Sequence, residues 1–138
     1  MKTSENQNAI FPQGQKAPQY FSGDAFVKML IENPLLNTTI GNVVFEPGCR
    51  NSWHSHPGGQ ILICINGTGY FQEKGKPIQL LQTGDVIQIA ENVVHWHGAT
   101  PDSEFTHIAV GPNADKGGPV WLDPVTEEEY NSYRQENA

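Results

Sequence analysis

The chain has 138 residues with 14 glycines and 10 prolines, a composition that favours one domain of short strands and many turns. Its formal net charge is −7 and lysine plus arginine total only 8, so we expect no nucleic acid partner, which would need a basic face. The sequence contains neither an apolar run of membrane-spanning length nor a hydrophobic signal core, so we expect a cytoplasmic protein without a membrane partner.

The first third of the chain leads from a polar arm into strands. Residues 1–19 are rich in asparagine and glutamine, and we predict an arm without a fold of its own. Residues 25–31 are too apolar for a solvated loop and fit either a strand or a short helix. Residues 38–46 contain several β-branched side chains and predict a strand, which Pro47 and Gly48 stop.

The next stretch has the spacing of metal ligands on a strand, a turn and a second strand. His54 and His56 lie one residue apart, so their side chains project to the same face of a strand and can converge on one ion. Residues 57–59, Pro-Gly-Gly, predict a turn that brings Gln60 back to the same point. We therefore predict a metal site here, because ordinary hydrogen-bonded histidines explain this combination less well.

The middle of the chain repeats short strands at regular intervals. Residues 61–65 are apolar on both faces, and the Asn-Gly-Thr-Gly sequence of residues 66–69 predicts a tight turn that makes a hairpin with residues 70–73. Further strands are expected at residues 78–81 and 86–89. This spacing indicates an all-β domain.

The three remaining histidines follow these strands. His95 and His97 repeat the His-x-His pattern, and His107 lies in a predicted last strand at residues 105–110. Beyond it, Thr126 and Glu129 have the spacing of a capping box and predict a short C-terminal helix.

Several other side chains are assigned to packing. Cys49 and Cys64 are expected to be free and buried, because a disulfide is rare in a chain that is not secreted. Trp53 and Trp96 flank histidines but alternate to the opposite face, so we expect packing or interface roles for them.

With these residues in view, the sequence resembles the small single-domain cupins. Their first motif is a glycine, two histidines one residue apart, a glutamate and a closing glycine, and glutamine replaces the glutamate here. Of the second motif, only the glycine and the histidine are present. The matching residues are Gly48, His54, His56, Gln60, Gly67, Gly84 and His95.

Within the cupins, the chain is most similar to the manganese-dependent hydroxynitrile lyases of the (R)-mandelonitrile lyase type. The shared pattern includes Trp53 to Pro57, Gln60, His95 to Ala99 and Thr106-His107. The resemblance implies a metal held by His54, His56, Gln60 and His95, with His97 and His107 lining the pocket as candidate catalytic residues. Manganese is the expected ion, and iron, nickel, zinc and copper are alternatives.

The glutamine has a physical consequence for such a site. Three neutral imidazoles and a neutral amide leave the charge of a divalent ion uncompensated, which favours anion binding at the metal. His97 lies two strand positions from His95, a rise of roughly 7 Å, so we expect it beside the metal rather than on it. A neutral His97 could then accept a hydroxyl proton, or it could simply orient its neighbours.

The sequence thus predicts an antiparallel cupin barrel with a short C-terminal helix. Its parts are an arm at residues 1–19, the barrel with an N-terminal edge segment at 20–112, and a loop and helix at 113–138. We expect a small-molecule substrate, cleavage or formation of cyanohydrins, and a homodimer or higher homo-oligomer. The alternatives are a metal-dependent dioxygenase and a cupin that binds metal and small ligands without turnover.

Overall fold

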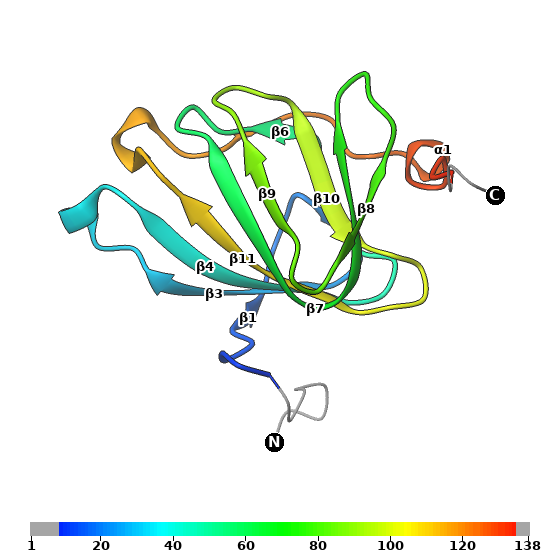
Figure 1. The fold of residues 1–138 in the computed structure, drawn as a ribbon, viewed down its shortest axis with the longest axis horizontal. Helices are drawn as coiled ribbons and strands as arrows, with labels where there is room; N and C mark the ends of the chain where they lie inside the picture. Colours follow the sequence, from blue (N-terminus) through cyan, green and yellow to red (C-terminus); the bar gives the residue numbers. More distant parts are fainter. Residues whose placement is uncertain (1–8, 135–138) are drawn as a thin grey trace.

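The computed structural model describes residues 9–134, which form an antiparallel β-structure curled around a hydrophobic core (Figure 1). Its strands are β1 (Gln15–Lys16), β2 (Phe21–Ser22), β3 (Ala25–Ile31), β4 (Thr39–Phe45), β5 (Arg50–Asn51), β6 (His54–Ser55), β7 (Gln60–Glu73), β8 (Gln79–Gln82), β9 (Val86–Ile89), β10 (His95–Ala99), β11 (Phe105–Gly111) and β12 (Val120–Trp121). Two short 3₁₀ turns, Pro34–Leu36 and Ala114–Lys116, and one helix, α1 (Glu127–Tyr130), complete the described part. The predicted all-β class with a short C-terminal helix is confirmed.

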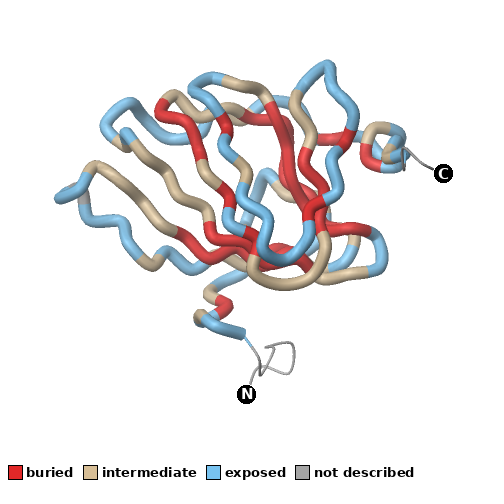
Figure 2. Tube along the Cα trace, in the orientation of Figure 1, coloured by how far each residue is buried: buried red, intermediate tan, exposed pale blue. Residues whose placement is uncertain are grey.

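The strands form two layers that are joined by β7. In the first, β1, β3, β4, β11 and β7 are neighbours in that order, and β9 pairs with the other edge of β7. In the second, β7 continues between β8 and β10, which is followed by β5 and β2. Buried residues gather on β4, β10 and β11 (Figure 2). The histidines of β10 and β11 therefore lie on strands with a buried face.

The course of strand β7 differs from one prediction. We predicted a hairpin with a tight turn at residues 66–69, and this is wrong because β7 runs through them without reversing. Gly67 has a φ of 74°, and a side chain there would collide with the Glu104 carbonyl. The register of β11 against β7 shifts between Thr106 and His107. Ile65 is the extra residue at this shift, so β7 has a bulge next to the Asn-Gly pair, where the strand passes from the first sheet into the second.

The N-terminal segment is partly built into the first sheet. Residues 25–31, which fitted a strand or a helix, form strand β3. β1 pairs with it, with Gln15 opposite Val27, so part of the segment predicted as an arm forms a sheet edge. Residues 1–8 of that arm lie outside the described residues.

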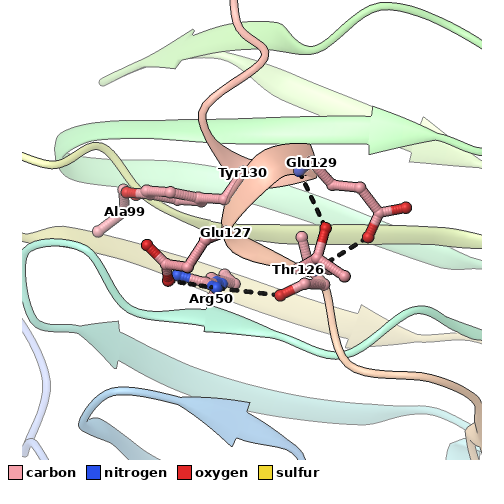
Figure 3. Close-up of polar contacts among 7 residues, drawn as sticks. Arg50, Ala99, Thr126, Glu127, Glu129 and Tyr130 are labelled. Atoms are coloured by element: carbon pink, nitrogen blue, oxygen red, sulfur yellow. Dashed lines mark hydrogen bonds and ion pairs between the residues drawn. The ribbon is translucent and has the colours of Figure 1, made fainter.

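The predicted capping box at the C-terminal helix is confirmed (Figure 3). The Glu129 backbone N–H donates to the Thr126 hydroxyl at 3.0 Å, and the Thr126 backbone N–H donates to the Glu129 carboxylate at 2.9 Å. These bonds satisfy donors that a helix N-terminus would otherwise leave unpaired.

Arg50 and Tyr130 fasten this helix to the second sheet (Figure 3). Arg50 Nη2 donates to the Val125 carbonyl at 3.0 Å and pairs with the Glu127 carboxylate at 2.8 Å. The guanidinium lies 4.6 Å from the Tyr130 ring centroid, and the Tyr130 hydroxyl donates to the Ala99 carbonyl at 2.6 Å. The C-terminal segment is thereby tied to β5 and β10, which carry residues of the candidate site.

The packing predictions agree with the structure. Trp53 and Trp96 belong to a buried cluster with Tyr130, and Cys49 and Cys64 are buried free thiols. Within residues 9–134, no helix is both long and apolar enough to cross a membrane. The homodimer stays a prediction.

Candidate metal centre

A strand, a turn and a second strand position the first histidines. His54 lies on β6, residues 57–59 turn the chain, and Gln60 opens β7. Gly59 has a φ of 84°, in the left-handed region that favours glycine. β6 pairs antiparallel with β10, so that His54 lies directly opposite His95. Sheet pairing therefore brings together histidines that are far apart in the sequence.

His54, His95 and His97 converge on one point. A ring nitrogen of each lies within 4.8 Å of those of the other two. Their exposed fractions are 1%, 0% and 3%. Imidazole nitrogens bound to one divalent ion at about 2.1 Å lie roughly 3–4 Å apart, so a small contraction would form such a site.

The hydrogen bonds of two of these rings leave the correct nitrogen free for a metal. His54 Nδ1 lies 2.7 Å from the Ser52 carbonyl, and His95 Nδ1 lies 2.9 Å from the Val93 carbonyl. A carbonyl oxygen only accepts, so Nδ1 carries the proton in both rings. The lone pair is on Nε2, as in metal-binding histidines that donate their other N–H to a backbone carbonyl.

The other two predicted ligands border this cluster. The His56 ring centroid lies 5.0 Å from that of His54, and its buried Nε2 has no partner among the described residues. Gln60 Oε1 lies 3.2 Å from His95 Nε2. Both of these atoms are acceptors when His95 is protonated on Nδ1, and a cation between them would satisfy both. The residues present therefore fit a divalent metal.

His97 lies closer to the centre than its spacing suggested. We expected the strand rise to keep His95 and His97 apart, yet their ring centroids are 5.6 Å apart and their planes differ by only 15°. Side chains can lean toward each other, so backbone rise alone does not exclude His97 from the metal.

His97 is also held from its other side. Its Nδ1 lies 3.1 Å from Nε2 of His107. The Asn51 carboxamide oxygen accepts from the His97 backbone N–H at 2.9 Å, which turns the Asn51 amide nitrogen toward the ring, 3.4 Å from Nδ1 and 3.3 Å from Nε2. His107 Nδ1 is buried and has no hydrogen-bond partner among the described residues. Asn51, His97 and His107 thus form one buried polar group.

Burial lowers the pKa of every histidine in the site, because desolvation penalises the charged ring. The pKa falls to about 4 for His56 and for His107. It is lowered for His95 and lies well below the usual range for His54 and His97. All five rings are therefore neutral at pH 7, which is the form that binds metals.

A cavity of about 410 Å³ opens beside the histidines. Among the described residues, no aspartate, glutamate, lysine or arginine lines it. Apolar side chains supply much of its wall, including Phe21, Val27, Met29, Val43 and Trp121. Such a cavity suits an uncharged, largely apolar molecule whose polar end reaches the histidines.

All six residues predicted for the site, His54, His56, Gln60, His95, His97 and His107, lie together. Sequence reasoning missed Asn51 and Trp121. No local pattern marks either residue, because their positions depend on the pairing of β5 with β10 and of β12 with β6.

Comparisons with known proteins identify the family. Residues 41–111 match the family model described as a cupin domain. The chain belongs to the cupin family.

Three similar proteins extend this result. The chain is 36% identical over 118 residues to an (R)-mandelonitrile lyase from Granulicella tundricola, covering 85% of this chain and 90% of the relative. It is 50% identical to a cupin-like protein from Thermotoga maritima whose crystal structure superimposes with a TM-score of 0.89, covering 94% of this chain and 100% of the other. A DMSP lyase from Ruegeria pomeroyi, at 19% identity and a TM-score of 0.67 over 83% of this chain and 64% of the other, shares the fold.

Proposed function

We propose that this cupin is a divalent-metal-dependent lyase that cleaves or forms cyanohydrins. The observation that carries the proposal is one cavity lined by His54, Gln60, His97 and His107. The 36% identity to an (R)-mandelonitrile lyase supports the choice of reaction. The absence of charged lining residues within residues 9–134 supports it, because cyanohydrins and aldehydes are uncharged.

His54, His56, Gln60 and His95 would hold the metal, for which we propose manganese. When bound, the ion supplies a Lewis acid for the hydroxyl oxygen or for cyanide. The four neutral donors do not reduce its positive charge, so anions that develop during cleavage are favoured near it.

His97 is proposed to move the proton. Cleavage breaks the carbon–carbon bond to the nitrile carbon, and the electron pair leaves with cyanide. The hydroxyl proton passes to the neutral His97 ring, and then from His97 to cyanide, giving aldehyde and hydrogen cyanide. Burial lowers the pKa of His97 and so disfavours its protonated ring. The cyanide anion beside the ring offsets part of this cost by electrostatic attraction. His107 contacts His97 at Nδ1, and the Asn51 amide nitrogen lies 3.4 and 3.3 Å from the two ring nitrogens, so both side chains hold the ring in place. The proton is proposed to go to Nε2, which does not contact His107.

A mandelonitrile cleavage assay with elemental analysis of the freshly purified protein tests the proposal. We expect benzaldehyde release that depends on the bound metal, is lost after chelation and returns on adding manganese. Metal-loaded protein that releases no benzaldehyde but consumes oxygen with a catechol would contradict the lyase and support a dioxygenase. Metal binding without either reaction would support a binding role.

A further inference from the structure

Trp121 lies next to His54 although the two are far apart in the sequence. β12 pairs antiparallel with β6, which places Trp121 opposite His54. Two backbone hydrogen bonds continue this pairing: Leu122 N–H donates to the Trp53 carbonyl at 2.8 Å, and Trp53 N–H donates to the Asp123 carbonyl at 2.9 Å. The position of the Trp121 backbone is therefore fixed relative to the strand that carries His54.

The Trp121 side chain contacts the His54 ring directly. Their ring centroids are 4.6 Å apart with an interplanar angle of 37°. Tyr20 stacks on Trp121 at the same centroid distance, 4.6 Å, with the two planes only 2° apart. This parallel stack restricts the indole, and the indole in turn limits how far the imidazole can tilt.

Tyr20 supports His54 by a second route through the backbone. Its φ is 71°, an uncommon and costly value for a residue with a side chain. In this conformation the Tyr20 carbonyl accepts from the Ser52 N–H at 2.9 Å, and the Ser52 carbonyl accepts from His54 Nδ1 at 2.7 Å. Tyr20 thus supports the His54 ring in two ways. It stacks on Trp121, which lies against the face of the ring, and it binds Ser52, which accepts a hydrogen bond from the ring edge.

We propose that Trp121, held by Tyr20, is a positioning residue that fixes the His54 imidazole with its Nε2 toward His95 and His97. The Ser52 hydrogen bond selects the tautomer but leaves the ring free to tilt, and the Trp121 face restricts that tilt. This inference rests on the metal site of the proposed function but not on the lyase reaction. Its consequence is that residues outside the metal ligands set the affinity for the metal.

Zinc affinity of the full chain, measured by competition with a chromophoric chelator, tests the proposal. Trp121→Ala should weaken zinc binding by about tenfold, since supports of metal ligands typically contribute ten- to a hundredfold to affinity. Trp121→Phe keeps an aromatic face and should restore most of the loss. Val120→Ala is the matched control, because Val120 lies on the same strand but pairs with Ser55.

Tyr20→Asn is a second variant, chosen because it is compatible with the positive φ at this position. Asparagine tolerates a positive φ, so the Ser52 hydrogen bond is kept while the stacked ring is lost. We expect weaker zinc binding than in Tyr20→Phe, which keeps the ring. Long-range proton–nitrogen NMR of the metal-free protein should show His54 ring signals that differ between Tyr20→Asn and Tyr20→Phe. Both variants keep the Trp121 indole beside His54, so the difference reports the orientation of the ring and not the loss of its neighbour.

The outcomes separate this inference from the metal site itself. If the parent protein does not bind zinc, both the metal site and the inference are wrong. If the parent binds zinc and Trp121→Ala binds it equally well, only the inference is overturned. Equal weakening in Trp121→Ala and Val120→Ala would also overturn it. If Trp121→Ala does not fold, the comparison of Tyr20→Asn with Tyr20→Phe decides.

Discussion

His107 Nε2 lies 3.1 Å from Nδ1 of His97, a member of the three-histidine cluster, and both rings are buried. One of the two nitrogens must donate and the other accept, so the protonation of one ring fixes that of the other. This contact couples the candidate metal centre to a histidine on β11.

Replacing His97 should remove activity but not the metal. In His97→Ala, the four proposed ligands His54, His56, Gln60 and His95 remain, while the proton acceptor is lost. We expect mandelonitrile cleavage to fall by at least about a hundredfold, the usual contribution of a general base. Elemental analysis of the same preparation should show the parent metal content.

A control on β11, the strand of His107, separates this effect from general damage. Thr106→Val alters the residue next to His107 on β11 without removing a histidine, and it should leave cleavage close to the parent rate. Metal content that falls together with activity in His97→Ala would contradict the base role and make His97 a ligand.

Replacing Gln60 by glutamate should weaken anion binding at the metal. The carboxylate adds a negative charge next to the ion, and like charges about 4 Å apart repel by about 1–4 kcal/mol. We therefore expect Gln60→Glu to raise the dissociation constant for azide by about tenfold in a spectroscopic titration of the metal-loaded protein.

An equal charge placed elsewhere provides the control. Gln79 is an exposed residue of β8 outside the cavity, so Gln79→Glu should leave azide affinity unchanged. Azide affinity in Gln60→Glu that equals or exceeds the parent value would refute the role assigned to the neutral glutamine.

The parts of this protein that follow from its sequence are those with local signals. The His54/His56 spacing and the turn before Gln60 correctly predicted that these side chains share one region. The spacing of Thr126 and Glu129 predicted the helix start because a capping box is made within four residues.

The parts that could not be predicted depend on contacts between distant segments. Gly67 lies in the predicted turn at residues 66–69. Its packing against Glu104 and the register shift of β11 show instead that β7 continues through this position. Asn51 and Trp121 reach the site through pairing with β10 and β6, which no spacing within their own segments indicates.

Arg50 should contribute more to stability than its ion pair with Glu127 does. Its side chain is 8% exposed and that of Glu127 is 79% exposed, so water screens the ion pair. Arg50→Met also leaves the Val125 carbonyl without its side-chain donor, and an unpaired buried acceptor costs about 2 kcal/mol. We expect Arg50→Met to lower the free energy of unfolding by about that amount, measured by chemical denaturation.

Glu127→Gln is the paired variant for this measurement. It removes the charge but leaves the Val125 hydrogen bond, so the loss should be no more than about 0.5 kcal/mol. Equal losses in the two variants would show that the ion pair, not the hydrogen bond to Val125, fastens the helix.

The two thiols should react with iodoacetamide far more slowly in the folded protein than in the unfolded chain. Burial raises the pKa of Cys49 to about 12 and that of Cys64 to about 11, from an ordinary value of 9.0. The thiolate is the reactive form, so a raised pKa lowers its fraction at every pH below the folded value. Between pH 7 and 9, mass spectrometry should therefore show little labelling of the native protein and complete labelling in denaturant. Rapid labelling of either thiol in the native protein at pH 8 would mean that the core around it opens readily.

The same pKa shifts predict how stability depends on pH. Above about pH 9 the unfolded chain loses the two thiol protons while the folded state keeps them, so the free energy of unfolding declines as the pH rises.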